Sequence, residues 1–456
     1  MKERKPPADG ITANPDFVKL WVGETISLTG TQVTMFALPL IGVLTLHASV
    51  FQVGLLNAMR TIPVLFFSLF AGAWLDRRRR RPVMIVCSLG NAILIGLVPV
   101  SYGLGVLTLA LLFVVCIVSG VLSVVFDVGV QTYVPSIIER RHLSASNSRM
   151  QTSYSISLAA GPGLAGLLVG LITAPVTLSV DAVSYLCSAI GLLSIRKPEE
   201  APAKPAVQTS ILKSIGEGLA AVYGDRTLRY LLILSGTFNF VQSAFITVFM
   251  VYAVRDEHAS SVRLGIVLAA IALGGIVGAM YTNRIGARLG VGLTMFLGIV
   301  MAVLFPMVLL IPHDFSLPAV LLMSAAEFCY GFGVLAFNVH AITLRQAITP
   351  NRLLGRSNAS YRLVVVGTAP LGAILIGVLG DYAGLHFAFA ASVLAFPAAL
   401  ITIPLCPAFR LKEIPARAAD DDEDGPAVEA QPTSAHPEPA DATATPAGTT
   451  AATPSP

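Results

Sequence analysis

The sequence predicts an all-α polytopic membrane protein with twelve transmembrane helices in two six-helix bundles related by pseudo-two-fold symmetry. Composition, the spacing of apolar runs and an internal repeat support this prediction. Of the 456 residues, 55% are hydrophobic and only 12% are charged, and the mean hydropathy is +0.75. Soluble domains carry about 25% charged residues. The basic residues lie in loops beside apolar runs, so the net charge of +4 reflects membrane topology and not nucleic-acid binding.

Twelve apolar runs are long enough to cross a bilayer, which requires about 20 residues in a helix. We expect spans at 17–44, 51–74, 82–104, 106–130, 150–173, 175–195, 228–254, 262–283, 290–312, 317–343, 360–380 and 385–406. No cleavable signal peptide is expected, because residues 1–16 are polar and the following apolar run is too long for a signal-peptide core.

The lysines and arginines predict the orientation of these spans. With a cytoplasmic N-terminus, all of the 30 basic residues except Arg60, Arg255 and Arg263 lie on the cytoplasmic side. Cytoplasmic loops are the ones enriched in lysine and arginine. We therefore expect a multi-pass protein of the cell (inner or plasma) membrane with both termini in the cytoplasm.

The spans and the segments between them divide the chain into five regions. The linker at 196–227 contains a predicted amphipathic helix, from Ser210 to Arg226, that is expected to lie on the cytoplasmic leaflet. The last region is acidic and rich in Pro, Ala and Thr, so it is expected to be disordered. The regions are a cytoplasmic tail at 1–16, a first bundle at 17–195, this linker, a second bundle at 228–412 and the final tail at 413–456.

An internal repeat relates span four and its following loop, 120–147, to span ten and its loop, 331–358. Phe126 matches Phe337, and Asp127 falls opposite Asn338. Spans four and ten have the same orientation, which indicates two halves related by an axis along the membrane normal. Ser146 and its match Ser357 are expected to cap the membrane helices that follow them.

Residues 72–81, GAWLDRRRRR, form a short basic turn between spans two and three. Its consecutive arginines must lie outside the hydrocarbon, because one charge at mid-bilayer already costs several kcal/mol. Asp76 is placed to meet the positive N-terminal end of the span at 360–380, which begins on the same side of the membrane.

Together these features resemble the major facilitator superfamily over residues 17–410, and most closely its drug and siderophore exporters, typified by macrolide efflux proteins and enterobactin exporters. The motifs that carry this likeness are GAWLDRRRRR, Trp21-x-Gly23-x-x-x-Ser27-x-x-Gly30, Arg60-x-x-Pro63, Tyr133-x-Pro135 with Leu143-x-x-x-Asn147, and Asp181-Ala182-x-Ser184-Tyr185. The resemblance implies a secondary active exporter of amphipathic small molecules that works by alternating access and proton exchange. We expect a monomer whose partners are a small-molecule substrate, protons and membrane lipids, with no nucleic acid, cofactor or metal.

In this family the turn after span two acts as a cytoplasmic gate, a latch between helices. The resemblance assigns that role to Gly72, Asp76, Arg77 and Arg81. The alternative is a basic cluster that only holds the loop in the cytoplasm. In the matching turn of the second half, Thr282 replaces the aspartate, so the first half is expected to carry the latch.

Four charged residues are candidates for proton coupling. Glu327 lies near mid-bilayer in span ten, where an ionisable group is a functional candidate by default. It is expected to face a water-filled cavity and to carry a proton or contact a cationic substrate; the alternative is a neutral packing role. Glu24 and Asp127 lie nearer the cytoplasmic ends of their spans, where they could reach water or loop arginines, so a structural role is favoured for each over proton coupling. Arg60 needs an acceptor that the sequence does not identify.

The resemblance also places spans one, four, seven and ten around the central cavity. Polar and aromatic residues of these spans form the expected substrate-contacting set, although polar residues also hold membrane helices together. The set is Thr31, Gln32, Phe238, Asn239, Gln242, Phe245 and Phe337.

The chain carries no nucleophile–base constellation, metal-ligand cluster or G-x-x-x-x-G-K-[ST] phosphate loop, so no enzyme activity is expected. Transport must then use an ion gradient or run downhill. Two alternatives to drug export remain: a dedicated exporter of one natural product such as a siderophore, and a transporter-like sensor or scaffold.

Overall fold

The computed structural model describes residues 14–75, 77–139, 142–199, 211–311, 315–413 and 415, and every regular element within them is a helix. The helices of the first half are α1 (Pro15–Leu40), η2 (Ile41–Thr45), α2 (Val50–Leu75), α3 (Arg80–Gly103), α4 (Leu109–Ile137), α5 (Leu143–Ile172) and α6 (Ala174–Leu193). Those of the linker and second half are α7 (Ile211–Gly224), α8 (Arg226–Arg255), α9 (Ser261–Leu289), α10 (Val291–Leu304), η4 (Phe305–Leu310), α11 (Leu317–Ile348), α12 (Asn351–Ala383), α13 (Leu385–Leu394), η5 (Phe396–Leu405) and η6 (Pro407–Arg410). Most of both expected tails lies outside the described residues.

Eleven helices of the described part are long and apolar enough to cross a membrane. They match the first eleven predicted spans. The twelfth predicted span, 385–406, is not one regular α-helix: α13 ends at Leu394 and the chain continues as the 3₁₀ helix η5. The all-α, multi-pass fold is therefore confirmed, with a broken last span.

Two Phe-Pro pairs explain where α10 and α13 end. Pro306 follows directly after Phe305, at the start of η4, and Pro397 stands at the same place in η5. Proline has no N–H for the bond to the carbonyl four residues back, and its ring clashes with that carbonyl. Both segments therefore leave the α-helix here and proceed as tighter 3₁₀ turns.

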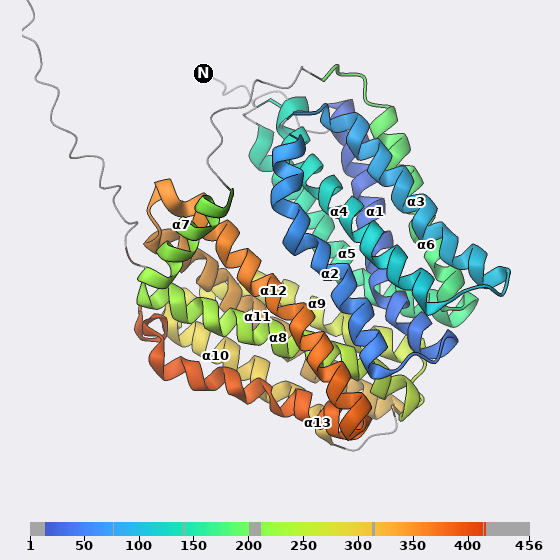
Figure 1. Cartoon of the computed structure of the whole chain (residues 1–456). Coiled ribbons are helices and arrows are strands. Elements are labelled where there is room, and N and C mark those ends of the chain that lie inside the picture. Colours follow the sequence, from blue (N-terminus) through green and yellow to red (C-terminus); the bar gives the residue numbers. More distant parts are fainter. Residues whose placement is uncertain are drawn as a thin grey trace, which may run out of the picture. The chain divides into compact units, whose positions relative to one another are not determined.

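The two halves repeat the same helix pairings, as the internal repeat predicts. In the first half α1 packs on α5 and α6, α2 on α4, and α3 on α4. In the second half α8 packs on α12 and α13, α9 on α11, and α10 on α11. Figure 1 shows the two groups, the first from blue to green and the second from green to red. The shared pairings support two bundles of equivalent topology.

Contacts between the halves run along two helix pairs, α2 with α12 and α5 with α9. Small residues allow this close approach. The Cβ of an alanine at Gly265 would lie 2.6 Å from the carbonyl oxygen of Pro162 and 3.1 Å from the Cα of Gly166. A methyl group at Gly54 would collide with the carbonyl oxygen of Ala373. Such small-residue contacts are a principal means of packing helices in a membrane.

We call the two ends of the helix bundle the basic end and the opposite end. The basic end holds Arg77 to Arg81, between α2 and α3, together with the first turns of α1 and α8. The opposite end holds the connections 46–49, 104–108 and 256–260.

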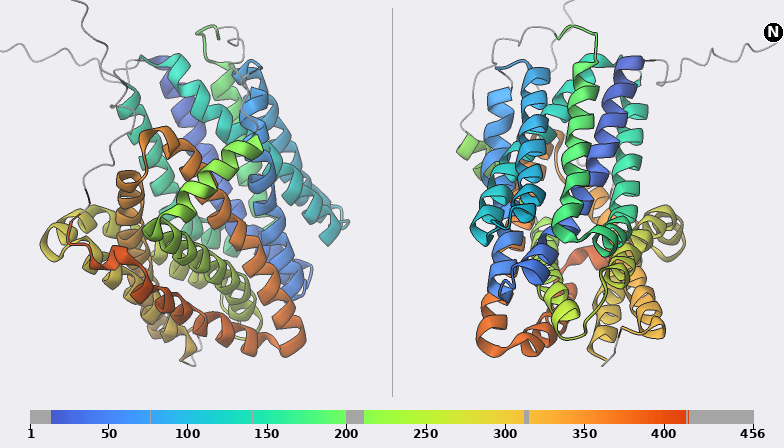
Figure 2. Two further views of the ribbon diagram at one scale, coloured as in Figure 1. Left: turned by 60° about the vertical axis from the view of Figure 1, so that its left-hand side comes forward. Right: turned by 90° about the vertical axis from the view of Figure 1, so that its right-hand side faces the viewer.

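Helix α7, at the basic end, packs on α12 (Figure 2). Glu217 and Arg356 form an ion pair, and Gly218 lies so close to the Arg356 carbonyl that a methyl group would not fit. Val222 is fully buried beside Leu228 of α8. The predicted amphipathic helix therefore exists, but it buries Val222 against protein and not in the lipid leaflet.

The expectation that Ser146 and Ser357 cap membrane helices is wrong. Helix α5 already begins at Leu143 and α12 at Asn351, so both serines lie inside helices and both are buried. The Ser146 hydroxyl donates to the carbonyl of His142, four residues back. The repeat in sequence thus reflects packing within equivalent helices.

Candidate transport site

The shared motifs of spans one and six pack α1 directly against α6. Asp181 is 1% exposed, and its Oδ2 accepts a hydrogen bond from Thr34 Oγ1 at 2.5 Å. The Ser184 hydroxyl donates to Asp181 Oδ1 at 2.9 Å. The Cβ of an alanine at Gly30 would lie 2.5 Å from the same oxygen. Asp181 is thus a structural acid whose hydrogen bonds hold two helices together.

Thr31 and Gln32, both predicted to contact substrate, take part in this packing of the first half. Thr31 Oγ1 lies 3.2 Å from the hydroxyl of Tyr185. Gln32 is buried, and a methyl group at Gly161 of α5 would collide with its Cβ. Neither residue lines the two cavities described next.

A cavity of about 630 Å³ lies between the two halves, and we call it the central cavity. Its walls come from α1, α2, α4 and α5 of the first half and from α12 of the second. Its charged residues are Glu24, Asp127 and Arg362. The polar residues Ser68, Gln131, Asn147, Gln151 and Tyr154 complete its polar lining.

The three charges of the central cavity interact with one another. Glu24 is 7% exposed and interacts electrostatically with Asp127, which in turn interacts with Arg362. Glu24 Oε2 is buried without a hydrogen-bond partner among the described residues. Two carboxyl groups of the first half thus share a cavity with a guanidinium of the second half.

Sequence reasoning missed Arg362. The predicted span began at residue 360, which put Arg362 at the membrane surface, whereas α12 begins at Asn351 and carries it further into the bundle. The signal available was a single arginine inside an apolar helical run, which is a functional candidate for the same reason as an acid.

A second cavity, of about 200 Å³, lies within the second half and is lined from α8, α10, α11 and α12. We call it the aromatic–amide pocket, after the rings of Phe238, Tyr330 and Phe337 and the amides of Asn239, Gln242 and Asn338. Four members of the predicted substrate-contacting set line it: Phe238, Asn239, Gln242 and Phe337.

Phe245, also in that set, stands behind the aromatic–amide pocket. It is 1% exposed and packs edge-on against Phe396, with ring centroids 5.7 Å apart. Phe396 makes a similar edge contact with Phe238, at 5.8 Å. Phe245 therefore supports the pocket wall through Phe396 and does not line the pocket.

Glu327 lies in the packed interior of α11 and lines neither cavity. It is 1% exposed, and neither carboxyl oxygen has a hydrogen-bond partner among the described residues. One residue further along, the backbone of Phe328 packs so closely on Gly274 of α9 that no methyl group fits there. An isolated ionised carboxylate in such a place is costly.

Arg60 of α2 forms no ion pair with a carboxylate in the part of the chain that the structure describes. The side chains close enough to interact with it electrostatically are Cys116 and Tyr185. Its backbone carbonyl packs 3.2 Å from the position of a Cβ on Gly120. The structure therefore does not bring Arg60 to the charges of the central cavity.

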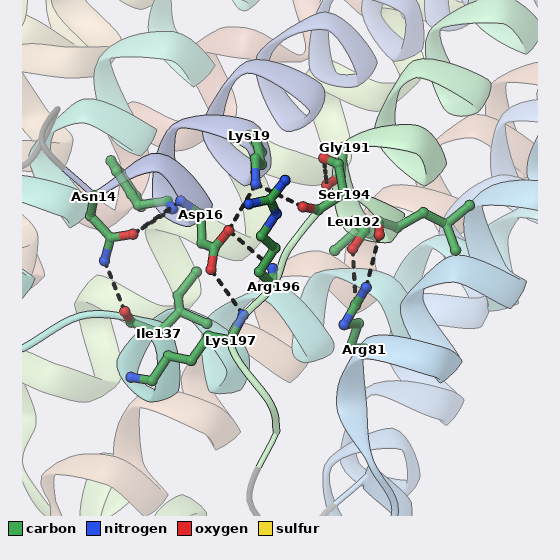
Figure 3. Close-up of polar contacts among 12 residues, drawn as sticks. Asn14, Asp16, Lys19, Arg81, Ile137, Gly191, Leu192, Ser194, Arg196 and Lys197 are labelled. Atoms are coloured by element: carbon green, nitrogen blue, oxygen red, sulfur yellow. Dashed lines mark hydrogen bonds and ion pairs between the residues drawn. The ribbon is translucent and has the colours of Figure 1, made fainter.

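At the basic end, Arg81 binds the last turn of α6 (Figure 3). Its Nε donates to the Leu192 carbonyl and its Nη2 to the Leu193 carbonyl, both at 2.9 Å. Carbonyl groups at a helix C-terminus lack partners within the helix and attract cations. Arg81 thereby ties α3 to α6 within the first half.

The rest of the predicted gate motif contributes no cross-half contact in the part described. Arg77 is exposed, and a Cβ added at Gly72 would meet no atom within 4 Å. Asp76 lies outside the described residues. The backbone N–H groups of Arg80 and Arg81 donate to the carboxylate of Glu199, which caps the start of α3.

Asp16 and its neighbours add a second set of contacts at the basic end (Figure 3). Asp16 pairs with Lys19 at 3.0 Å and accepts hydrogen bonds from the backbone N–H groups of Arg196 and Lys197. Asn14 donates to the carbonyl of Ile137, at the end of α4. These contacts join the ends of α1, α4 and α6.

At the opposite end, Asp381 of α12 caps α2 across the boundary between the halves. Its Oδ2 accepts from the Ser49 hydroxyl at 2.6 Å, and its Oδ1 accepts from the Val50 N–H at 3.0 Å. Arg255 of α8 donates to the carbonyl of Ala48 nearby. Sequence reasoning missed Asp381. It lies near the C-terminal end of its own helix, where a negative charge is unfavourable, and this unfavourable position could have indicated a functional residue.

This arrangement defines a class of protein: a membrane transporter built from two equivalent helix bundles around a shared cavity. A family model described as "Transmembrane secretion effector" matches residues 12–433, so the chain belongs to this family of major facilitator transporters. The predicted superfamily is confirmed.

Similarity to individual proteins agrees with this assignment. The chain is 28% identical to "Multidrug efflux pump Tap" of Mycolicibacterium fortuitum, over 84% of this chain and 93% of that protein. Among solved structures it resembles the nucleoside transporter NupG, with a TM-score of 0.67 and 13% identity over 87% of this chain and 100% of that one.

One further structural relative was solved in two states. A bacterial homologue of the iron transporter ferroportin, 17% identical, matches with a TM-score of 0.65 in its inward-facing state, over 88% of this chain and 100% of the homologue. In its outward-facing state the TM-score is 0.54, over 85% of this chain and 98% of the homologue. Both matches show that the present chain shares the fold of that homologue.

Proposed function

We propose that this protein is a secondary active exporter of amphipathic small molecules, in particular drugs, and that proton exchange drives it by alternating access. The observation that carries the proposal is the central cavity, in which Glu24 and Asp127 of one half share a space with Arg362 of the other. Family membership and the likeness to the Tap efflux pump support export as the direction.

In this proposal the basic end faces the cytoplasm of a cell with the protein in its inner or plasma membrane. The excess of lysine and arginine at that end supports the assignment. The central cavity then receives substrate from the cytoplasm, while the contacts at the opposite end keep the outer side closed.

Asp127 is the residue through which a proton would act on both halves. When charged, it attracts Arg362 of α12 across the cavity. When a proton neutralises it, that attraction is lost and Arg362 is free to find another partner. A ligand that binds only one of these arrangements shifts the balance between them, which is the basis of coupled transport.

Asp381 is the outer counterpart in this scheme. Its two bonds to Ser49 and Val50 exist only while α2 and α12 stay together at the opposite end. They must break for a substrate to leave on that side. We therefore assign Asp381 to the outer gate, with Arg255 and Ala48 as a neighbouring cross-half contact.

The test is transport by the purified protein in proteoliposomes with an imposed pH gradient and a panel of amphipathic drugs and siderophores. We expect gradient-dependent movement of at least one drug, abolished by a protonophore and by Glu24→Gln. Glu257→Gln, which changes an acid of a loop at the opposite end, is the matched control and should transport normally. If a siderophore alone is moved, the protein is a dedicated exporter; if no compound moves, the proposal fails.

A further inference from the structure

The aromatic–amide pocket offers aromatic faces and amides but no side chain that is charged at neutral pH among its described lining residues. Its ring walls are Phe238, Tyr330 and Phe337, and its amides are Asn239, Gln242 and Asn338. A charged ligand enclosed there without a counter-charge would be strongly destabilised. An uncharged ligand avoids that cost and still meets polar groups at the pocket wall.

The rings are arranged for a flat ligand. Phe238 and Tyr330 lie nearly parallel, with an interplanar angle of 17° and centroids 6.3 Å apart. Phe396 contacts both of them edge-on, at 5.8 Å and 5.9 Å. Parallel faces favour offset stacking with a planar π-system, and walls fixed by their own packing lose little freedom when a ligand binds.

The amides of the pocket retain hydrogen-bonding capacity. Gln242 Oε1 accepts from the Tyr330 hydroxyl, which leaves the Gln242 amide N–H groups available. Neither Asn239 nor Asn338 has a side-chain hydrogen bond to another residue within the described part of the chain. Polar groups at membrane depth without partners are costly, so these amides are suited to a ligand that supplies donors or acceptors at the edge of its ring.

The size of the pocket limits what fits. Cavities that hold a whole drug-sized molecule measure about 300–1,000 Å³, and this one measures about 200 Å³. One or two fused rings fit, and the remainder of a larger molecule must lie outside. Helix α12 lines both cavities, with Val365 in the aromatic–amide pocket and Val366 in the central cavity.

We propose that the aromatic–amide pocket binds an uncharged aromatic ring group of the transported molecule and is a subsite distinct from the charged central cavity. The repeat supports this division, because Asn338 stands where the first half has Asp127. The inference rests on the proposed export function for its physiological meaning, but ring binding itself is measured without transport.

The test uses two probes that share one ring system: N,N-dimethyl-1-naphthylamine, uncharged at pH 7.5, and its permanently charged N,N,N-trimethylammonium analogue. Binding to the full chain in lipid nanodiscs is measured by equilibrium dialysis, with empty nanodiscs subtracted. We expect the uncharged probe to bind at least about tenfold more tightly than the cation. Equal or tighter binding of the cation, or no binding of either probe above empty nanodiscs, would overturn the proposal.

Two variants locate that binding. Asn239→Leu replaces the amide with an apolar side chain that branches at the same carbon, and Val334→Phe fills the space from α11. Each should weaken binding of the uncharged probe by about tenfold. Thr343→Val lies on α11, as Val334→Phe does, but outside the pocket. It is the control and should bind the probe like the wild type. Unchanged binding in both pocket variants would place the probe elsewhere.

Folding, probe binding and transport are measured separately. Size-exclusion profiles and melting temperatures establish which variants fold, and because the two pocket variants act by different means, either one suffices. Loss of pH-driven transport in Glu24→Gln with intact probe binding supports both proposals. Absence of any transport by the wild type, with ring binding that depends on Asn239, refutes the export function and leaves the subsite standing.

Discussion

Helices α4 and α11 occupy equivalent positions in the two halves, yet the cavities beside them differ in charge. On α4, Asp127 follows Phe126 and lines a cavity that also holds Glu24 and Arg362. On α11, Asn338 follows Phe337 and lines a pocket of rings and amides. The repeated fold thus keeps the helix packing while the polarity of equivalent positions diverges. Under the two proposals, titratable chemistry belongs mainly to the first half, and neutral recognition to the second.

The most direct test of this difference between the halves is to exchange the side chains of Asp127 and Asn338. Asp127→Asn should lower pH-driven transport in proteoliposomes at least about tenfold, because the cavity loses the acid that faces Arg362. The double exchange, with Asn338→Asp added, should not restore transport, since the new acid lies in the other cavity. Recovery in the double variant would show that the two positions are interchangeable and that the comparison is wrong.

The opposite end of the α2–α12 contact provides the next test. Asp381→Ala removes the hydrogen bonds that this carboxylate accepts from Ser49, Val50 and Phe51. A hydrogen bond to a charged group is worth about 1.5–3 kcal/mol. We expect the closed opposite end to open in a larger fraction of molecules, seen as longer distances between spin labels at Leu44 and Tyr382. Asp256→Asn, which changes an acid at the same end that pairs with His386, is the control. An unchanged distance distribution in Asp381→Ala would remove the residue from the outer gate.

Two arginines of the basic end are expected to have different roles in the first half. Arg81 has a structural role, whereas Arg78 only holds the loop in the cytoplasm. Arg81→Ala loses two bonds to the last turn of α6 and should lower the free energy of unfolding by about 1 kcal/mol. Arg78→Ala changes an exposed neighbour and should leave stability unchanged. Chemical denaturation in detergent measures both. Equal stability of the two variants would contradict the contact between α3 and α6.

The smallest effect is expected for Glu327→Gln in the second half. Glu327 lines neither cavity, and glutamine keeps its volume without an ionisable group. We expect pH-driven transport within about threefold of the wild type, measured beside Asp127→Asn. A loss as large as that of Asp127→Asn would move the proton carrier into the second half.

Local sequence signals were sufficient for the helices and for part of the site. Apolar runs predicted twelve spans, eleven of which are long apolar helices in the described part of the chain. Polar or aromatic residues at membrane depth pointed to Phe238, Asn239, Gln242 and Phe337, which the structure places around one pocket. Thr31 has the same kind of signal, yet it packs against Tyr185. Polarity at membrane depth does not distinguish a cavity wall from a helix contact, because both satisfy buried polar groups.

The sequence alone could not predict which residues of one half contact which residues of the other. Arg362 faces Asp127, and Asp381 caps Val50, only because α12 has a particular register against the first half. That register depends on close contacts such as Gly54 on Ala373, which no periodicity within one span reveals. The fold could therefore be predicted span by span, whereas the charged site required the packing of one half on the other.

The Phe-Pro pairs that follow α10 and α13 affect how far these segments extend along their axes. An α-helix rises about 1.5 Å per residue and a 3₁₀ helix about 2.0 Å. The 10 residues of α13 and the 10 of η5 therefore extend about 35 Å together, compared with about 30 Å for 20 residues of regular α-helix. The hydrocarbon layer is about 30 Å thick. By stretching its second half, the last segment gains enough length to cross a bilayer at a tilt without any additional residue.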